Sequence, residues 1–295
     1  MPLVQVMDLI ENAQKGSYAV GYFESWNLAS LFGVLDAAEK TRSPVIIGFN
    51  GEFLTRPERL TEERISVYGA LGRAAAEHAT VPCGLLFNEC AREEDIYNAI
   101  EAGFSQVMLD DPHATPVDKQ RRVAHLVKYA HARGVSVEAE VGELPTGESG
   151  KEDSSGVATD PEDAARFAES TGVDVISISV GNVHILVKGE KKLDLKRIAA
   201  IRDRVNVPLD LHGGTGIPAE SLKEAINRGV SKVCYGTYLK QRYLSAVRQA
   251  LKNENVNPHK LLGMGEREDM LSACRIAVRD AVLERIEMLG CCGRI

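Results

Sequence analysis

Residues 159–181 read TDPEDAARFAESTGVDVISISVG and contain a complete helix followed by a strand. Pro161 suits the first turn of a helix behind Asp160, and the two acidic residues after it lie at the positive end of the helix dipole. Gly172 suits the left-handed residue that ends a helix. The apolar run 175–180 is typical of a strand covered on both faces. This stretch therefore predicts a helix that leads into a buried parallel strand.

The same unit recurs along the whole chain. Gly103, Gly134 and Gly229 each stand between a helical pattern and an apolar run, as Gly172 does. Residues 117–133 place apolar side chains on one helix face with the spacing i, i+3, i+4, i+7. Eight such units predict a (β/α)8 TIM barrel of the α/β class. An open doubly wound sheet is the alternative, but no Gly-x-Gly-x-x-Gly follows the first strand. The predicted strands are residues 18–23, 44–50, 83–88, 106–110, 136–141, 175–180, 208–213 and 231–236.

The length of 295 residues suits a single TIM-barrel domain over residues 1–295. Residues 142–159 are rich in glycine, serine and acidic residues, which predicts a mobile loop that acts as a lid or an interface element. Residues from about 253 to 295 predict extra C-terminal helices, most strongly over 266–289. Such an extension caps a barrel or makes an oligomer contact, and the sequence leaves both open.

Composition narrows the classes of partner. The chain has 35 Lys and Arg against 42 Asp and Glu, a formal charge of −7, which argues against bulk binding to nucleic acid or to an anionic membrane. It lacks an apolar window of about 18 residues and a secretory pattern at its start. Its six cysteines show neither zinc-ribbon spacing nor a disulfide framework. We therefore expect a cytoplasmic protein with reduced thiols.

Polar side chains gather at the predicted C-terminal ends of the strands, where a barrel carries its chemistry. His184 and His212 end the sixth and seventh strands, so we expect them to be neighbours. Glu89, after the third strand, is the carboxylate that we favour as their partner. Two neutral imidazoles and a carboxylate form a common divalent-metal site with open positions for a substrate. The plainer interpretation is that each histidine only makes a hydrogen bond.

The stretch 212–218, HGGTGIP, is glycine-rich and ends where a helix is predicted to begin. Glycines let backbone N–H groups approach an anion, and the helix dipole favours negative charge at that point. Thr215 adds a hydroxyl donor, Lys188 a point charge, and Thr237 stands at the start of the last helix of the barrel. The pattern predicts a phosphate site, and a bare tight turn is the alternative.

Several longer motifs indicate a family. They are SPVIIGFN (43–50), AIEAGFSQVMLDDP (99–112), GVSVEAEVG (134–142), PLDLHGGTGIP (208–218) and GVSKVCYGTYL (229–239). Together with residues 159–181 they resemble motifs of the class II, metal-dependent ketose-bisphosphate aldolases, which include fructose- and tagatose-bisphosphate aldolases. The resemblance covers nearly the whole chain. It implies a TIM barrel, a divalent metal that is usually zinc, and aldol cleavage of a sugar phosphate.

The resemblance also implies roles for single residues. His184 and His212 match two of the family's three zinc histidines, and Glu140 matches a glutamate beside the metal. Asp110 matches an aspartate at an alternative metal position. The positions that match the loop around the donor phosphate and the metal are Gly181, Lys188, Gly213, Gly214 and Thr215, with Thr237 matching a phosphate-binding hydroxyl.

The end of the third strand departs from the family. Where the family reads His-x-Asp-His-Gly, residues 86–90 read LFNEC, so Asn88 replaces the acid/base aspartate and Glu89 the third histidine. A carboxylate in place of an imidazole lowers the Lewis acidity of the site and widens the metal choice from zinc toward manganese, iron or cobalt. Because Asn88 cannot take a proton at neutral pH, Glu24 or Glu140 would have to serve, with a raised pKa.

The sequence thus predicts a divergent metal-dependent aldolase, a carbon–carbon lyase that acts on a phosphorylated ketose. A sugar-phosphate isomerase or epimerase on the same scaffold is one alternative. A non-catalytic partner subunit is another, favoured by the loss of the aspartate and disfavoured by the two histidines and the phosphate loop. The resemblance implies a homodimer or homotetramer.

Overall fold

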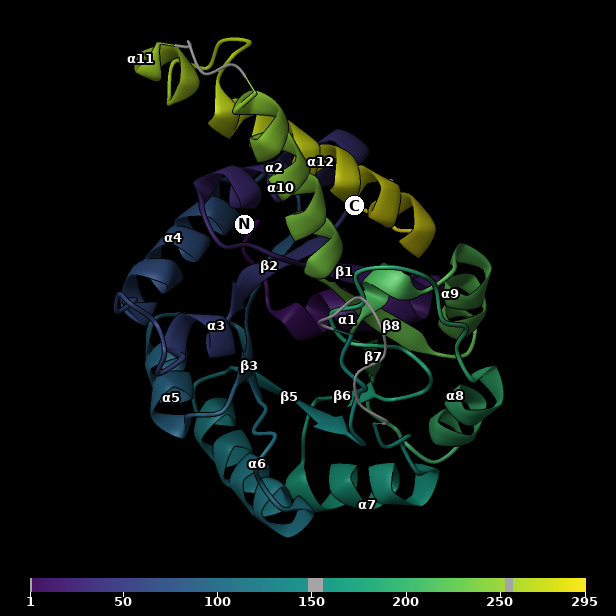
Figure 1. The fold of residues 1–295 in the computed structure, drawn as a ribbon. Helices are drawn as coiled ribbons and strands as arrows, with labels where there is room; N and C mark the ends of the chain where they lie inside the picture. Colours follow the sequence, from purple (N-terminus) through teal and green to yellow (C-terminus); the bar gives the residue numbers. More distant parts are fainter. Residues whose placement is uncertain (1, 148–155, 253–256) are drawn as a thin grey trace.

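The computed structural model describes residues 2–147, 156–252 and 257–295. Eight parallel strands pair in chain order and close into a barrel, which confirms the predicted TIM-barrel fold (Figure 1). Each predicted strand is present, although the sixth and seventh are shorter than expected and the third extends two residues further. The strands are β1 (Val20–Glu24), β2 (Val45–Asn50), β3 (Cys83–Cys90), β4 (Gln106–Leu109), β5 (Ser136–Val141), β6 (Val175–Ile178), β7 (Leu209–Leu211) and β8 (Val230–Tyr235).

Helices surround the barrel and begin and end where local chemistry favours it. The Asp160 side chain accepts hydrogen bonds from the first backbone N–H groups of α7, Pro161 occupies its first position, and Gly172 ends it with a φ of 70°. The helices are α1 (Val6–Gly16), α2 (Leu28–Thr41), α3 (Gly51–Thr55), α4 (Ile65–His78), α5 (Glu93–Glu101), α6 (Pro116–His131), α7 (Pro161–Thr171), α8 (Leu195–Arg202), α9 (Ala219–Ile226), α10 (Thr237–Ala250), α11 (Pro258–Leu261) and α12 (Met270–Leu289), with a 3₁₀ turn, η1, at Gly214–Gly216.

One helix closes the N-terminal end of the barrel and was not predicted. Val6, Leu9 and Ile10 of α1 pack against apolar side chains inside the barrel, among them Val20 and Leu86. Their spacing is that of a helix with one apolar face, so the sequence did carry the signal. The opposite, C-terminal end of the barrel is left for the site.

The C-terminal extension lies along the outside of the barrel. Helix α12 packs on α2 and α10 and reaches β1, while α11 projects away from the barrel (Figure 1). Close packing of α2 and α12 depends on Gly33, where a Cβ atom would lie 2.6 Å from the carbonyl oxygen of Arg275. Arg275 also holds Asp36 of α2 through two hydrogen bonds of 2.6 Å. The extension therefore covers a side of the barrel.

The long segment predicted after β5 is described at its two ends only. Glu143 and Val157 exchange backbone hydrogen bonds of 2.8 and 2.7 Å, so the two ends run antiparallel. The lid or interface prediction falls largely on residues 148–155, which lie outside the described residues. Among the helices of the described chain, none is both long and apolar enough to span a membrane.

Candidate metal centre and cavity

A cavity of about 250 Å³ opens at the C-terminal ends of the strands. It is bordered by side chains from opposite sides of the barrel, which the sequence separates by as much as 200 residues. The predicted site residues that border it are Glu24, Asn88, Glu89, His184, His212, Gly213, Thr215 and Thr237. The barrel thus brings the predicted metal ligands and most of the predicted anion loop to one place.

Glu89 is aimed into this cavity by an irregularity in β3. The pairing of β3 with β4 shifts register between Phe87 and Cys90, and Glu89 adopts a left-handed φ of 49°. A left-handed non-glycine residue costs about 1–2 kcal/mol, so the surrounding fold must hold it in place. Asn50 at the end of β2 does so in part, because its Nδ2 donates to Glu89 Oε2 at 2.5 Å.

Both histidines reach the same carboxylate oxygen. His212 Nδ1 lies 2.6 Å and His184 Nε2 lies 3.4 Å from Glu89 Oε1. The backbone of His184 is fixed on both sides by the segment after β5: its N–H donates to Pro145 O, and its carbonyl accepts from Gly147 N, each at 2.8 Å. The structure thus places the side chains of Glu89, His184 and His212 side by side.

The three side chains fit a divalent cation. One ligand atom from each lies within 4.8 Å of the other two, and Glu89 and His212 are buried. Burial opposes the charge on Glu89, but the neighbouring histidine rings and the Asn50 amide lower its pKa to about 2, so it is anionic at neutral pH. Two imidazoles and a carboxylate, with room beside them, are a recognised divalent-metal donor set.

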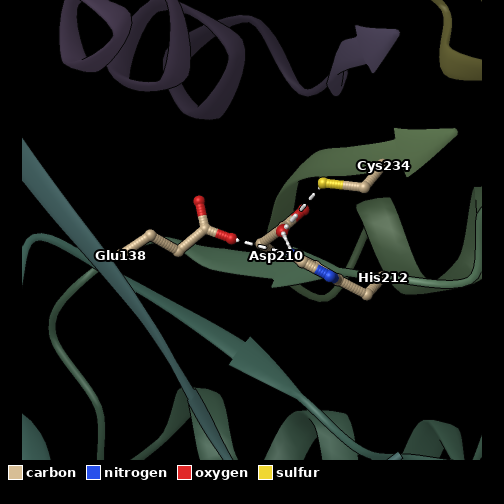
Figure 2. A group of neighbouring side chains, drawn as sticks. All are labelled: Glu138, Asp210, His212 and Cys234. Atoms are coloured by element: carbon tan, nitrogen blue, oxygen red, sulfur yellow. Dashed lines mark hydrogen bonds and ion pairs between the residues drawn. The ribbon is translucent and has the colours of Figure 1, made fainter. Parts of the chain in front are cut away.

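A second buried cluster lies directly beneath His212. Figure 2 shows the side chains of Glu138, Asp210 and Cys234 gathered around it. His212 Nε2 lies 3.1 Å from Glu138 Oε1 and 3.2 Å from Asp210 Oδ2. Since a carboxylate can only accept, Nε2 carries a proton, and Nδ1, which faces Glu89 Oε1, would bind a cation after losing its own proton.

This inner cluster already contains a cation of its own. The Lys232 ammonium donates to Glu138 Oε2 at 2.5 Å and to Asp210 Oδ2 at 3.1 Å, and it lies 3.3 Å from Cys234 Sγ. In the form that would bind a cation, with neutral histidines, three buried carboxylates, the third being Glu89, face one buried ammonium and leave a formal charge of −2. A divalent cation bound by Glu89, His184 and His212 would neutralise that charge.

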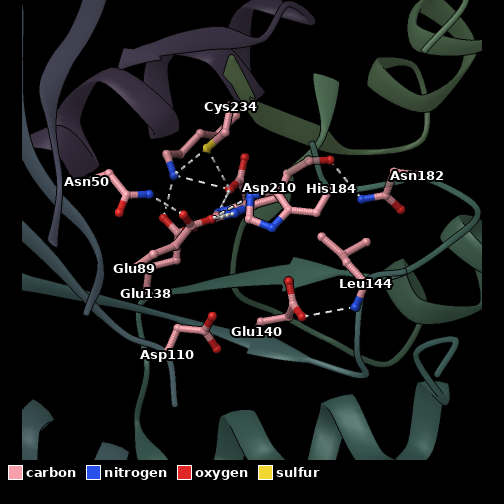
Figure 3. Close-up of polar contacts among 12 residues, drawn as sticks. Asn50, Glu89, Asp110, Glu138, Glu140, Leu144, Asn182, His184, Asp210 and Cys234 are labelled. Carbon is pink, nitrogen blue, oxygen red and sulfur yellow. Dashed lines mark hydrogen bonds and ion pairs between the residues drawn. The ribbon is translucent and has the colours of Figure 1, made fainter. Parts of the chain in front are cut away.

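The predicted anion loop follows His212. Gly213 has a φ of 69°, and a Cβ atom there would lie 2.3 Å from the carbonyl oxygen of Val183, so only glycine fits. The side-chain amide of Asn182 donates to the His212 carbonyl at 2.9 Å and holds the start of the loop (Figure 3). Thr215 Oγ1 accepts from Tyr238 N at 3.1 Å, which joins the loop to the beginning of α10.

Three predicted members of the anion site do not border the cavity. Gly214 is buried within the loop, whereas Gly181 and Lys188 are exposed. The cation on the cavity wall is instead Lys240 of α10, which the sequence analysis missed. Its ammonium lies 2.6 Å from Glu24 Oε1 and 4.2 Å from the centre of the Phe53 ring. Its signal was its position three residues after Thr237, one helical turn along the same face.

Glu24 reaches the cavity from the end of β1 and is fitted closely against β8. A Cβ atom on Gly236 would lie 2.2 Å from Glu24 Oε2, so a glycine leaves room for the carboxylate. Burial raises the pKa of Glu24, and the Lys240 ammonium opposes that rise. The carboxylate is thus placed where it can exchange a proton with a ligand.

Glu140 lies beside the cavity and does not border it. Figure 3 shows its carboxylate toward Asp110 and the backbone of Leu144, whose N–H donates to Glu140 Oε1 at 3.3 Å. Burial and the negative charge of Asp110 raise the pKa of Glu140 to about 7. Glu140 therefore ionises near neutral pH. Of the two candidate proton acceptors, however, it is Glu24 that borders the cavity.

Asn88 is buried at the end of β3 and borders the cavity, and its Oδ1 has no hydrogen-bond partner among the described residues. Asn88 was predicted from the sequence, whereas Tyr22, Asp210 and Lys232 inside the barrel were not. Tyr22 and Asp210 each stand two positions before a predicted site residue on the same strand, and side chains at i and i+2 share one face. Lys232 carried no such signal.

Comparisons with known proteins agree with this geometry. The family described as "Fructose-bisphosphate aldolase class-II" matches residues 4–294. A fructose-bisphosphate aldolase of Geobacillus stearothermophilus is 34% identical over 303 residues, covering 100% of this chain and 99% of that protein. A probable fructose-bisphosphate aldolase of Bacillus subtilis is 33% identical, with 98% of each chain covered. The crystal structure of the YdjI aldolase from Escherichia coli has a TM-score of 0.82 at 29% identity, covering 99% of both chains. The chain therefore belongs to the class II fructose-bisphosphate aldolase family.

Proposed function

We propose that the protein is a metal-dependent lyase that cleaves a phosphorylated ketose by a retro-aldol reaction. The observation that carries the proposal is that Glu89, His184 and His212 converge on a cavity also bordered by the glycine-rich loop. Carbon–carbon cleavage needs a charge-stabilising cation, an anchor for the substrate and a proton acceptor. The cavity offers residues for each.

The cation would be held by Glu89, His184 and His212. When bound, it supplies Lewis acidity that polarises a ketone oxygen and stabilises the negative charge that develops during cleavage. Zinc suits the two imidazoles best, and the carboxylate admits manganese, iron or cobalt. Glu138 and Asp210 would hold His212 in the orientation that this requires.

The phosphate would bind at the loop of Gly213, Gly214 and Thr215, with Thr237 at the start of α10. Backbone N–H groups and threonine hydroxyls are the donors that a phosphate takes at such a site. Family resemblance also assigns Gly181 and Lys188 to this subsite. Their exposed positions support a role at its outer edge at most.

The proton on the hydroxyl of the cleaved carbon would pass to a carboxylate. Glu24 is the first candidate, because it borders the cavity and has room for its carboxylate beside Gly236. Glu140 is the second, because a pKa of about 7 suits proton transfer near neutral pH. Asn88 would contribute a hydrogen bond and no proton transfer.

The test begins with protein stripped by a chelator and reloaded with zinc, manganese, iron or cobalt. Aldol cleavage is then assayed over several ketose phosphates, starting with fructose 1,6-bisphosphate. We expect cleavage that depends on metal, and its loss in Glu24→Gln with metal still bound. Glu140→Gln tests the second candidate, and Glu220→Gln on the exposed face of α9 is the matched control.

Other outcomes identify the alternatives. Bound metal with interconversion of ketose phosphates and no cleavage would indicate an isomerase or epimerase. Protein that takes up no metal and alters no sugar phosphate would indicate a non-catalytic subunit. Full activity in both glutamine variants would reject the two carboxylates as the proton acceptor.

A further inference from the structure

Tyr22 lies at the floor of the cavity, inside the barrel. Side chains alternate along β1, so Val20 and Tyr22 face inward, while Phe23 packs outside among the helices. In the pairing of β1 with β8, Tyr22 stands opposite Cys234. The Lys232 ammonium is 5.7 Å from the centre of the Tyr22 ring, so the ring lies between the inner ion cluster and the cavity that it borders.

The hydroxyl of Tyr22 is left without a partner. The side chain is 2% exposed, and its oxygen makes no hydrogen bond within the described chain. An unpaired buried hydroxyl costs about 1–3 kcal/mol, and a phenylalanine would fill the same space without that cost. A tyrosine at this place therefore calls for a partner that arrives from outside the chain.

The surroundings of Tyr22 keep its hydroxyl protonated, and its charged neighbours lie on the cavity wall. Burial and the negative charges of Glu24 and Glu89 raise the pKa of Tyr22 well above its ordinary value. The phenol is thus available as a donor at any ordinary pH. Both of these neighbours border the cavity, as does His212.

The hydroxyl is at present enclosed by these neighbours. Glu89 Oε1 and His212 Nδ1 are 2.6 Å apart, whereas two ligands of one tetrahedral cation stand roughly 3.4 Å apart. Glu89 and His212 would have to separate in order to hold a cation, and this would open space beside Tyr22. A second unpaired group, Asn88 Oδ1, borders the same cavity and can only accept.

We propose that Tyr22 is a further substrate-binding residue, whose hydroxyl donates a hydrogen bond to an oxygen of the ligand while Asn88 Oδ1 accepts one from a ligand hydroxyl. The ligand would therefore carry a carbonyl or hydroxyl oxygen close to a free hydroxyl group, as a ketose does. This assignment rests on the proposed function for the identity of the ligand as a ketose phosphate.

The experiment compares the metal-loaded wild type with Tyr22→Phe. Cleavage kinetics with fructose 1,6-bisphosphate and calorimetric affinity for dihydroxyacetone phosphate are measured together with thermal unfolding. We expect kcat/KM and affinity to fall about 5- to 150-fold, the range for leaving a ligand oxygen unpaired. We expect Tm to stay equal or rise, because an unsatisfied hydroxyl is removed.

Ser231→Ala is the control. Ser231 lies on the neighbouring strand β8 and also has a buried hydroxyl without a hydrogen-bond partner among the described residues, but it does not border the cavity. We expect an equal or higher Tm and unchanged kinetics. Asn88→Ala should lower kcat/KM for fructose 1,6-bisphosphate and the affinity for dihydroxyacetone phosphate.

Two outcomes would overturn the assignment while leaving the proposed function intact. One is wild-type kinetics and affinity in Tyr22→Phe. The other is a lower Tm in that variant, which would give the hydroxyl a structural role. A metal-loaded wild type that neither binds nor cleaves any ketose phosphate would instead reject both the proposed function and this assignment.

Discussion

Glu89 Oε1 lies 2.6 Å from His212 Nδ1, although 123 residues separate the two in the chain. The contact joins the strained end of β3 to the end of β7 across the mouth of the barrel. A carboxylate oxygen and an imidazole nitrogen held this close, with His184 beside them, form the core of the proposed metal centre. This relationship leads to the first prediction.

Replacing Glu89 with glutamine should greatly weaken the binding of a divalent cation. The loss in affinity should exceed the ~10–100-fold that is typical when a residue that only orients a metal ligand is lost. The amide removes the anionic ligand while keeping its size. Glu89→His should retain the cation and shift the preference toward zinc, because a third imidazole suits that metal. Competition with a chelator measures both affinities.

Glu52→Gln is the control for that series, since Glu52 is near the cavity but its carboxylate is half exposed and lies 3.6 Å from Arg56. We expect this variant to bind metal like the wild type. Equal metal affinity in Glu89→Gln and the wild type would contradict the proposed centre.

Asp210→Asn should weaken metal binding about 10–100-fold, although Asp210 is not one of the proposed metal ligands. Asp210 accepts from both Lys232 and the His212 ring, and the amide leaves the buried ammonium with Glu138 as its anionic partner. Stability should also fall, by about 1.5–3 kcal/mol, because a buried hydrogen bond to a charged group is weakened. Denaturant unfolding and metal titration measure the two effects.

Lys232→Met separates the two effects. It leaves Glu138 and Asp210 buried without their ammonium, so stability should fall, whereas both carboxylates still accept from the His212 ring and metal affinity should not fall. Unchanged metal affinity in Asp210→Asn would show that this carboxylate does not orient His212.

Gly213→Ala should abolish binding of a sugar phosphate. At a φ of 69° its Cβ atom would lie 2.3 Å from the Val183 carbonyl oxygen, so the loop has to move. Gly134 has the same φ, but a Cβ atom there meets nothing within 4 Å. Gly134→Ala should therefore cost only about 1–2 kcal/mol of stability and leave binding intact. Calorimetry with the ketose phosphate compares the two, and equal affinities would argue against an anion site at Gly213.

Glu140 should make stability depend on pH near neutrality. Its pKa is about 7 in the folded protein against an ordinary value of 4.5, so the folded state retains a proton that the unfolded chain releases. The stabilising contribution is present below pH 4.5 and is lost as the pH rises through about 7. The Tm of metal-free wild type should accordingly fall relative to Glu140→Gln between pH 5 and pH 8.

Asp110→Asn is the companion variant, because the Asp110 charge helps to raise the pKa of Glu140. Without that charge, the loss of stability should occur at lower pH. A constant difference in Tm between the wild type and Glu140→Gln over this range would mean that Glu140 titrates normally.

Local sequence patterns were sufficient to predict most of the secondary structure and the order of the strands. The sequence 159–181 carries its own start signal, its own stop signal and its own buried run, all of which act over a few residues. Helix α1 carried a comparable signal, in the spacing of Val6, Leu9 and Ile10, and was overlooked.

The convergence of Glu89, His184 and His212 was predictable from the strand ends, because parallel strands in a barrel bring their C-terminal ends to one face. The position of the cavity lysine was harder to predict from the sequence. Lys188 matches a family position yet is exposed, whereas Lys240 lines the cavity. The conformation of the loop after β6 decides where Lys188 lies, and no short-range pattern specifies it, whereas Lys240 was indicated by its place one helical turn after Thr237.

By itself, the sequence determined the barrel, its eight strands and the identity of the groups at its mouth, because hydrophobic periodicity and helix capping are local interactions. Only the tertiary structure decided that Lys232 balances Glu138 and Asp210, and that the Tyr22 hydroxyl has no partner among the residues that the structure describes. Those relationships depend on which inward-facing side chains meet across the barrel. That is set by strand register and side-chain packing between residues far apart in the chain.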